Sequence, residues 1–279
     1  MPVLHRPRSL AEACDLMGSL EEPMVYGGGT AIQILIKQGV LFAEHLVDIG
    51  SVPGLDVLEE TTAGLRVGPL VTLRQMETRP EVRTRTPLAA QTYGRVANPR
   101  VRNTASVGGN IAHGDYRLDP PTALMALDAQ VELTSSSGTR TVPAREFFVD
   151  FQLTAVEPGE IITAVVLPDQ PAGATFAYVK LSSLSADDWP SASAAALVVA
   201  EPGGRRTLRL GLGALAAVPL FLQVDVTGGT VEDAVDAARA AVDPVLDPIP
   251  DIRGGADYKR RLGHVATADA VRRAWEGVR

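Results

Sequence analysis

Residues 102–129, RNTASVGGNIAHGDYRLDPPTALMALDA, join a glycine-rich turn to a well-marked helix start. The turn centres on Ser106-Val107-Gly108-Gly109-Asn110, where glycines let backbone N–H groups approach a phosphate closely. A helix is expected over residues 122–127, because Asp119 can cap it and the prolines that follow suit its first turn. A strand is expected from residue 130 onward. The stretch therefore predicts a turn suited to a diphosphate, followed by a helix and a strand.

A second glycine-rich turn lies earlier, in residues 23–39, PMVYGGGTAIQILIKQG. A strand is expected at residues 24–26 and a helix at residues 30–38, ended by Gly39. The turn between them consists of Gly27, Gly28, Gly29 and Thr30. It lacks the GK[ST] of a P-loop and the GxGxxG of a dinucleotide-binding fold. By itself it is better explained as a plain connection between a strand and a helix.

Composition limits the class of protein. The chain has 279 residues, 46% hydrophobic and 21% charged, which is typical of a folded protein of about two domains. Its single cysteine, Cys14, excludes an intrachain disulfide and a multi-cysteine zinc or iron–sulfur site. A net charge of −7 does not favour nucleic acid as a partner. We expect a cytoplasmic protein without a membrane span, because the longest apolar run, residues 210–222, contains two glycines and a proline.

The remaining pattern is a mixture of helices and strands. A capping box at Ser9 and Glu12 starts the first expected helix. Further strands are expected at residues 45–49, 65–67, 70–71, 130–134, 139–142 and 160–167, with helices at 73–78 and 81–98. After a linker at 168–174, strands are expected at 175–181, 192–201 and 206–215, then helices at 230–242 and 256–278. This order predicts an α+β fold with a domain boundary near residue 170.

Taken together, the two turns resemble the FAD-binding medium subunit of the molybdenum hydroxylases, the carbon monoxide dehydrogenase and xanthine dehydrogenase family. Residues 102–129 follow the family pattern RN-x-[GA]-[ST]-[IV]-GGN-[IL]-A-x-[AG]-[DS]-x-x-x-D-x-P-x-x-[LM]-x-[AL]-L-[DG]-A at nearly every position. Residues 26–37 are similar to AGG-[QH]-[ST]-L-L-P-x-[ML]-K. Residues 5–17, 160–162 and 258–274 are similar to the family as well, so the resemblance covers almost the whole chain.

The resemblance implies a fold and a domain order. Residues 1–170 would form an FAD-binding domain of the vanillyl-alcohol-oxidase type, with two α/β subdomains at about 1–55 and 56–170. Residues 171–279 would form a smaller C-terminal α+β flavoprotein domain.

The resemblance also implies which residues bind FAD. The first turn would hold the diphosphate with Gly28, Gly29, Thr30, Ala31 and Ile32, beside Gly27, and the second turn with Ser106, Gly108, Gly109 and Asn110. Asp119, Ile162 and Lys180 match family positions at or near the flavin. The residues alone leave alternatives open: Asp119 as a helix cap, Ile162 as core and Lys180 as a solvated strand residue. No catalytic side chain and no metal site are expected.

Two positions depart from the family pattern. Gly29 replaces the usual glutamine or histidine and removes one side-chain donor from the first turn. The family often has basic residues after the lysine, as in K-x-x-x-R-R, whereas residues 181–189 contain Asp187 and Asp188. This segment would lie beside the flavin ring, so it leaves the electron acceptor open. Trp189 at its end would shield the ring or belong to the core.

Three functions follow from these observations. In the first, the chain is an electron-transfer subunit that passes electrons from [2Fe-2S] clusters of a small subunit through FAD to NAD, a quinone or dioxygen. A large subunit would carry the molybdenum cofactor and hydroxylate the substrate. In the second, the chain is a free-standing FAD-dependent oxidoreductase that acts on a small molecule. In the third, it is a flavin-free scaffold or interaction protein.

Overall fold

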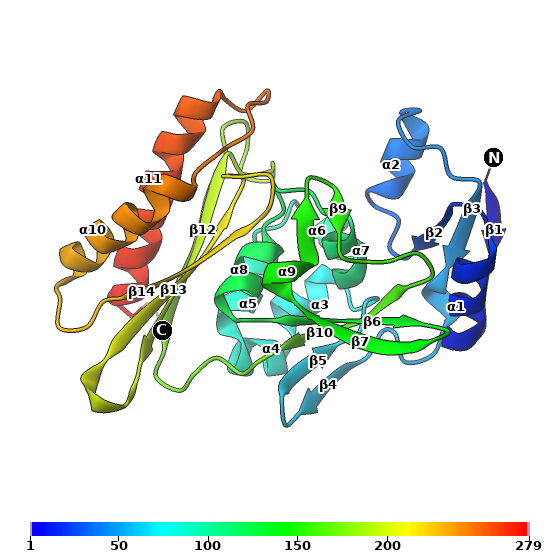
Figure 1. Ribbon diagram of the computed structural model, residues 1–279, viewed down its shortest axis with the longest axis horizontal. Coiled ribbons are helices and arrows are strands. Elements are labelled where there is room, and N and C mark those ends of the chain that lie inside the picture. Colours follow the sequence, from blue (N-terminus) through cyan, green and yellow to red (C-terminus); the bar gives the residue numbers. More distant parts are fainter. Residues whose placement is uncertain (1, 278–279) are drawn as a thin grey trace.

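The computed structural model describes residues 2–277, and its strands form three main sheets. Figure 1 shows these sheets following one another along the longest axis of the molecule, in the order of the sequence. A further small sheet pairs β8 (Phe148–Asp150) with β9 (Leu153–Thr154). None of the helices within residues 2–277 is both long and apolar enough to cross a bilayer. The predicted α+β fold is confirmed.

The first sheet is parallel, with the strand order β1-β3-β2. It contains β1 (Val3–His5), β2 (Pro23–Tyr26) and β3 (His45–Asp48), connected through α1 (Leu10–Ser19) and α2 (Ile32–Lys37). The Ser9 hydroxyl caps α1 by accepting the Glu12 N–H at 3.1 Å, as predicted, but the Glu12 carboxylate reaches the N–H of Arg8. Cys14 is buried beneath this sheet. Helix α2 is shorter than expected, because residues 28–31 remain in the turn.

The central sheet is antiparallel, with the strand order β4-β5-β10-β6-β7. Its strands are β4 (Leu58–Thr61), β5 (Gly64–Val67), β6 (Gln130–Ser135), β7 (Gly138–Pro143) and β10 (Ile161–Leu167). The prediction of a strand at residues 70–71 is wrong. These residues form a turn, because the N–H groups of Leu70 and Val71 bond to the carbonyls of Leu55 and Gly68.

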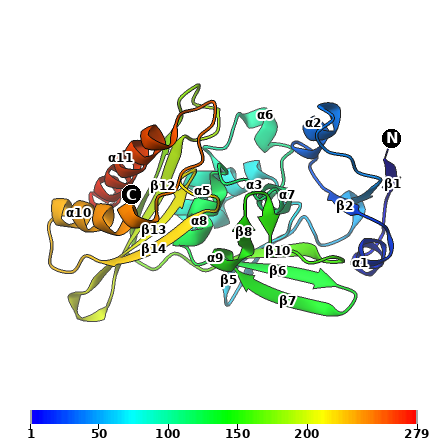
Figure 2. The same ribbon diagram turned by 45° about the horizontal axis from the view of Figure 1, so that its top comes forward.

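Short helices cover one face of the central sheet (Figure 2). They are α3 (Leu73–Thr78), α4 (Pro80–Arg85), α5 (Pro87–Tyr93), α6 (Pro99–Arg102), α7 (Val107–Ala112) and α8 (Pro120–Ala126), with α9 (Ala144–Phe147) after β7. The single helix expected over residues 81–98 is wrong. Proline disfavours helical backbone in the residue before it, and Thr86, before Pro87, has φ −137°.

The third sheet is an antiparallel meander of β11 (Thr175–Leu181), β12 (Ala192–Ala200), β13 (Arg206–Gly213) and β14 (Leu220–Asp225). Helices α10 (Val231–Val242) and α11 (Ala256–Trp275) cover one face, and α8 lies against the other (Figure 1). Gly211 permits the approach of α8, because a β-carbon there would collide with the Thr122 carbonyl. The expected end of the last helix, Val278, lies outside the described residues.

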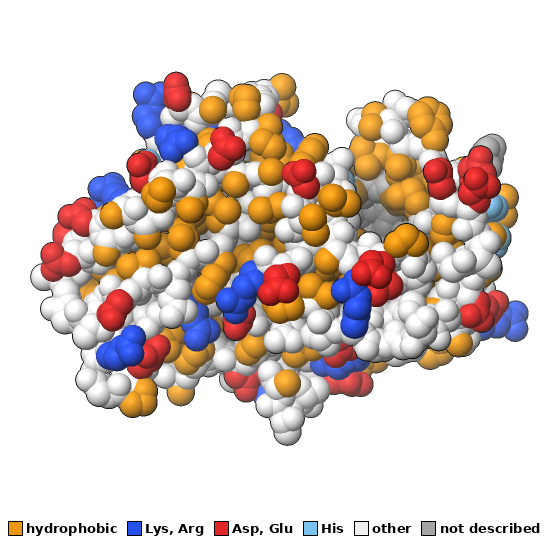
Figure 3. All heavy atoms as spheres, viewed as in Figure 1, with side chains coloured by type: hydrophobic (Ala, Val, Ile, Leu, Met, Phe, Trp, Pro, Cys, Tyr) orange, Lys and Arg blue, Asp and Glu red, His pale blue; other side chains and the backbone are white. Residues whose placement is uncertain are grey.

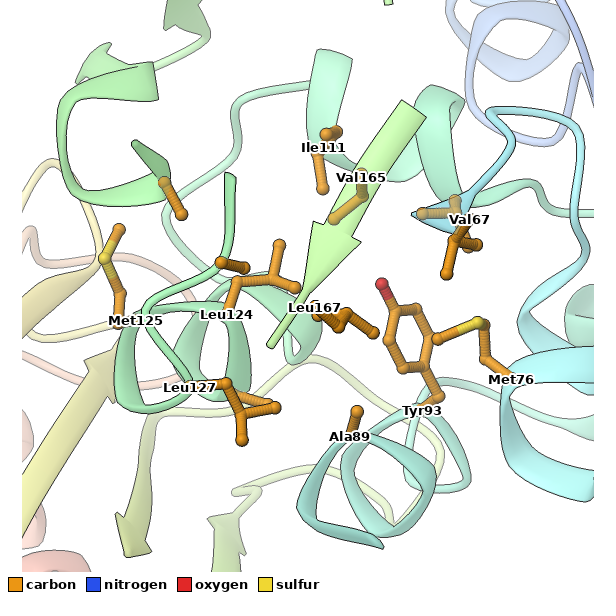
Figure 4. Close-up of a cluster of buried hydrophobic side chains, with 14 of the residues drawn as sticks. Val67, Met76, Ala89, Tyr93, Ile111, Leu124, Met125, Leu127, Val165 and Leu167 are labelled. Atoms are coloured by element: carbon orange, nitrogen blue, oxygen red, sulfur yellow. The ribbon is translucent and has the colours of Figure 1, made fainter. Parts of the chain in front are cut away.

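A shared hydrophobic core joins the central and third sheets. Figure 4 shows its centre, where Tyr93 from α5 lies among Met76, Val67 and Leu167. The same cluster includes Tyr178 of β11 and Leu197 of β12. Residues before and after position 170 therefore belong to one buried hydrophobic cluster. The division into domains at residue 170 stays a proposal.

Candidate functional site

The two glycine-rich turns lie against each other in space. A β-carbon on Gly28 would collide with the Thr104 carbonyl oxygen and lie 3.2 Å from the Ala105 Cα. Residue 28 must therefore be glycine for the first turn to reach the second. The two turns are almost eighty residues apart in the sequence, so only the folded chain brings them together.

A small pocket opens between these turns and β10. It has a volume of about 100 Å³, room for a small group but not for a whole dinucleotide. Its lining includes five of the residues predicted to bind the cofactor: Gly27, Ser106, Gly108, Gly109 and Ile162. Most of the rest of the wall is apolar, with Pro69, Leu70 and Ile161. Figure 3 shows the surface hollowed beside the lobe that carries α2.

The first turn offers a row of unused hydrogen-bond donors. The backbone N–H groups of residues 28–32 have no acceptor among residues 2–277. The Thr30 hydroxyl also makes no hydrogen bond within that range. Consecutive free N–H groups form the concave donor arrangement that binds phosphates in many proteins. The donor set of this turn therefore fits a diphosphate.

The substitution at Gly29 has a structural cause. Its φ is +71°, a conformation that side-chain-bearing residues rarely adopt, and a β-carbon there would collide with the Tyr26 hydroxyl. That hydroxyl accepts a hydrogen bond from the Gln33 side-chain amide. The Gln33 Nε2 lies only 3.1 Å from where a β-carbon of residue 29 would stand. Gln33 thus places a side-chain amide beside the turn from which the usual family side chain is missing.

The second turn uses most of its own donors internally. The N–H groups of Val107 and Gly108 donate to the carbonyls of Val71 and Pro69, each at 2.9 Å. The Gly109 N–H donates to the Ser106 hydroxyl at 3.3 Å. Gly108 is required by packing, because a β-carbon there would lie 2.5 Å from the Pro69 Cβ. Gly109, in contrast, has only the Ser106 hydroxyl near its β-carbon position, at 3.0 Å.

Asn110 carries a signal of a missing partner. Its side-chain oxygen Oδ1 is buried and has no hydrogen-bond partner in the structure. An unsatisfied buried acceptor costs about 1–3 kcal/mol, so such atoms usually have a ligand or water as partner. Asn110 directly follows Gly109 of the pocket wall. The second turn therefore fits a polar ligand through the Asn110 side chain more than through its backbone.

Asp119 and Lys180 form a buried ion pair. The Lys180 Nζ lies 3.0 Å from the Asp119 Oδ2, and the two side chains are 1% and 2% exposed. The same Nζ donates to the Arg95 carbonyl at 3.0 Å, and the Tyr178 hydroxyl donates to the Asp119 Oδ1. Burial raises the pKa of the Asp119 carboxyl above its usual value, although Lys180 and Tyr178 act in the opposite direction. Burial and the nearby Asp119 raise the pKa of Tyr178 well above its ordinary value.

This pairing overturns two of the alternatives considered above. Asp119 is not a helix cap, because its side chain makes no capping hydrogen bond and its backbone is helical, with φ −70° and ψ −49°. Lys180 is not solvated. Tyr178 was missed, although its place two residues before Lys180 puts both on one face of β11.

The predicted residues therefore fall into two groups. Gly27, three residues of the second turn and Ile162 line the pocket, whereas residues 28–32, Asn110, Asp119 and Lys180 do not belong to its wall. Asp119 and Lys180 lie between α8 and β11, on the side of the third sheet that α8 covers. No cluster of three or more His, Cys, Asp or Glu within residues 2–277 could hold a metal ion.

Two arginines from elsewhere in the chain lie beside the altered segment 181–189. The Trp189 ring lies 4.1 Å from the Arg117 guanidinium carbon and 5.5 Å from that of Arg253. Arg253 also donates twice to the Asp188 carboxylate, at 2.7 and 2.9 Å. The hydrogen bonds from Arg253 lower the pKa of Asp188. The segment therefore has cationic neighbours that its own sequence lacks.

Comparison with known proteins places this geometry in a family. The FAD binding domain in molybdopterin dehydrogenase matches residues 2–170. The carbon monoxide dehydrogenase medium chain of Afipia carboxidovorans is 32% identical, over 97% of this chain and 95% of its own. The nicotine 6-hydroxylase medium subunit of Paenarthrobacter nicotinovorans is also 32% identical, over 92% of this chain and 91% of its own.

Solved structures agree with these sequence matches. A reconstituted CO dehydrogenase from Oligotropha carboxidovorans contains a chain that superposes with a TM-score of 0.92 at 30% identity, covering 100% of both chains. A quinoline 2-oxidoreductase from Pseudomonas putida matches with a TM-score of 0.89 at 26% identity, covering 99% of this chain and 98% of its own. The chain therefore belongs to the molybdenum hydroxylase family, as an FAD-binding medium subunit of an oxidoreductase.

Proposed function

We propose that this chain is the electron-exit subunit of a three-subunit molybdenum hydroxylase. A large subunit with the molybdenum cofactor would oxidise the substrate, and a small subunit with [2Fe-2S] clusters would deliver the electrons to this chain. FAD supplies a redox centre that accepts those electrons and passes them to an external acceptor. The names of the relatives, medium chain and medium subunit, support a multi-subunit assembly.

The observation that carries the proposal is the unused row of N–H groups at residues 28–32. These groups and the Thr30 hydroxyl would hold the diphosphate of FAD without any charged side chain. From the second turn, the Asn110 side chain and the Ser106 hydroxyl would complete the polar contacts, and Gly109 would leave room for the ligand. Ile162 would contribute an apolar wall.

Asp119, Tyr178 and Lys180 would serve the flavin end of the cofactor. Lys180 uses two of its three N–H donors, on Asp119 and on the Arg95 carbonyl, and keeps one free. Both side chains of the ion pair are fixed before any ligand arrives, so little conformational entropy is lost on binding. Such a preformed polar group suits recognition of a planar heterocycle with donors and acceptors at its edge.

A purified sample tests the cofactor and the assembly separately. An oxidised-flavin absorption spectrum, with FAD identified after acid release, is the expected result for the chain. Purification of the tagged chain from its own cells should yield two further subunits, with molybdenum and iron found by metal analysis. A chain that contains FAD, purifies alone and oxidises small molecules would support the free-standing oxidoreductase. A colourless chain that does not take up added FAD would contradict both assignments.

Two features of the structure bear on the alternative of a free-standing enzyme. That alternative rested on the loss of positive charge after Lys180. Arg117 and Arg253 lie beside Trp189 and Asp188, but their charges are largely neutralised, because Arg117 pairs with Asp115 and Arg253 with Asp188. Among residues 2–277, Glu160 is the one titratable side chain in the pocket lining that could act as a general acid or base on a substrate. The Glu160 carboxylate is held by Arg140 at 2.6 and 2.8 Å.

A further inference from the structure

A second cleft lies among α3, α4 and α5. It has a volume of about 280 Å³ and is lined by Glu77, Arg83, Ala90, Gln91, Gly94 and Arg95. None of these residues belongs to the pocket at the glycine-rich turns. The cleft is therefore a separate feature of the molecule, with its own polar side chains.

The free polar groups of this cleft are hydrogen-bond donors. Arg83 uses its Nε on the Glu77 carbonyl at 3.0 Å, and its two terminal nitrogens have no partner among residues 2–277. The Arg95 guanidinium has neither an ion pair nor a hydrogen bond within the same range. The Gln91 Oε1 accepts the Tyr178 N–H at 2.8 Å, which leaves its amide nitrogen free to donate.

The Glu77 carboxylate and the Ala90 carbonyl of the cleft are already occupied. Glu77 is its only acidic residue, and its carboxylate binds Arg74 at 2.7 Å and Arg102 at 2.9 Å. Burial alone would raise the pKa of Glu77, but the hydrogen bonds from these two arginines lower it below its usual value. The Ala90 carbonyl accepts the Gly94 N–H at 3.1 Å. A ligand in this cleft therefore meets hydrogen-bond donors and two guanidinium groups that form no ion pair among residues 2–277.

The local charge contrasts with that of the whole protein. Residues 74–102 contain seven arginines and two glutamates, in a chain of net charge −7. Guanidinium groups bind phosphate oxygens through paired N–H donors, with a geometry that favours phosphate over a spherical anion. Two unpaired guanidiniums and one amide N–H in a single cleft form a donor set of that type.

We propose that the cleft of Arg83, Gln91 and Arg95 binds the phosphoryl group of a small anionic molecule. The proposal uses none of the residues assigned to FAD, so it stands independently of the proposed function. The cleft is also joined to the Asp119–Lys180 pair. The Gln91 side chain holds the Tyr178 N–H, and the Arg95 carbonyl accepts from the Lys180 Nζ.

Calorimetric titration of the FAD-loaded chain tests the proposal. The probes are inorganic phosphate, inorganic diphosphate and NAD⁺, each at low ionic strength because salt screens such contacts. The wild-type chain should bind at least one probe, and the double variant R83Q/R95Q should bind it at least tenfold more weakly. R95Q keeps the backbone carbonyl that Lys180 uses, so the ion pair is not removed. The control is R205Q, because Arg205 is exposed, lies in the connection between β12 and β13, and is 3.8 Å from Asp225.

The probes distinguish the sources of the phosphoryl group. Binding of phosphate or diphosphate indicates a site for a free phosphate group, and binding of NAD⁺ alone indicates a dinucleotide. Absence of binding by all three probes would overturn the proposal, as would equal binding by wild type and R83Q/R95Q. Flavin absorbance in each sample reports separately on FAD, and a chain without FAD should give the same titration result at the arginine cleft.

Discussion

Lys180 donates to Asp119 across 61 positions of sequence, and both side chains are almost completely excluded from solvent. Burying two opposite charges is stabilising only when both are present and well hydrogen-bonded. The pair meets this condition because Tyr178 and the Arg95 carbonyl satisfy further donors and acceptors. Since Asp119 directly precedes α8 and Lys180 belongs to β11, the pair also fixes the third sheet against the central part of the chain.

Removing one charge of the Asp119–Lys180 ion pair should lower the free energy of unfolding more than removing both charges. Lys180→Met leaves the Asp119 charge buried without compensation, and we expect a loss of about 3–5 kcal/mol in the free energy of unfolding. The double variant Asp119→Asn with Lys180→Met should recover part of that loss. Urea unfolding followed by circular dichroism measures each value. Equal stability of the single variant and the wild type would show that the pair contributes nothing.

The adjacent glycines of the second turn should respond differently to substitution. Gly108→Ala forces a β-carbon against Pro69, and we expect a loss of about 1–3 kcal/mol in unfolding free energy, as for other overpacked sites. Gly109→Val adds a side chain toward the pocket that Gly109 lines, so it should mainly reduce FAD content. Thermal unfolding and flavin absorbance on both variants separate the two effects. Full flavin content in a folded Gly109→Val protein would contradict the role given to this position.

We expect the Asn110 side chain to contribute to FAD affinity and not to the stability of the FAD-free chain. Asn110→Ala removes a buried acceptor without a partner, so the unfolding free energy of the FAD-free chain should fall very little. Affinity for FAD should fall about tenfold, the equivalent of roughly 1.4 kcal/mol for one lost hydrogen bond. Fluorescence quenching during FAD titration measures the change.

Asn98 provides the matched control for Asn110. Its side chain caps α6 by accepting the N–H groups of Arg100 and Val101 at 3.0 and 3.2 Å. Asn98→Ala should therefore cost about 1 kcal/mol of stability and leave FAD affinity unchanged. If Asn98→Ala lowered FAD affinity while Asn110→Ala lowered only stability, Asn110 would not belong to the FAD site.

We expect acid to lower the stability of the folded chain through Glu160, which lines the pocket. Hydrogen bonds from Arg140 lower the pKa of Glu160 below its ordinary value of 4.5 in the folded chain. The unfolded chain then binds the proton more tightly, so the stabilisation is complete above pH 4.5 and is lost as the pH falls through the lower folded-state pKa. Acid titrations of wild type and Glu160→Gln, followed by circular dichroism, should show a smaller pH dependence below pH 4.5 in the variant. Identical acid dependence in both proteins would exclude this linkage.

Much of the local structure follows from short sequence signals. The Ser9 hydroxyl caps its helix as expected, and the hydroxyls of Thr72 and Thr230 cap two further helices in the same way, because a helix cap depends on residues three positions apart. The hairpin of β6 and β7 and the positions of both glycine-rich turns follow in the same way. Strand β14 was not predicted, although Pro219 directly before it marks a break in the apolar run that follows β13.

The sequence by itself determined the α+β class, the two turns and, through their motifs, membership of an FAD-binding family, since each of these depends on contiguous residues. Only the tertiary structure decided which turn offers free N–H groups, because the partners of Val107 and Gly108 come from residues 69–71. It also paired Asp119 with Lys180 and surrounded Trp189 with Arg117 and Arg253. Burial and charge pairing depend on residues that are far apart in the chain, so a local pattern cannot specify them.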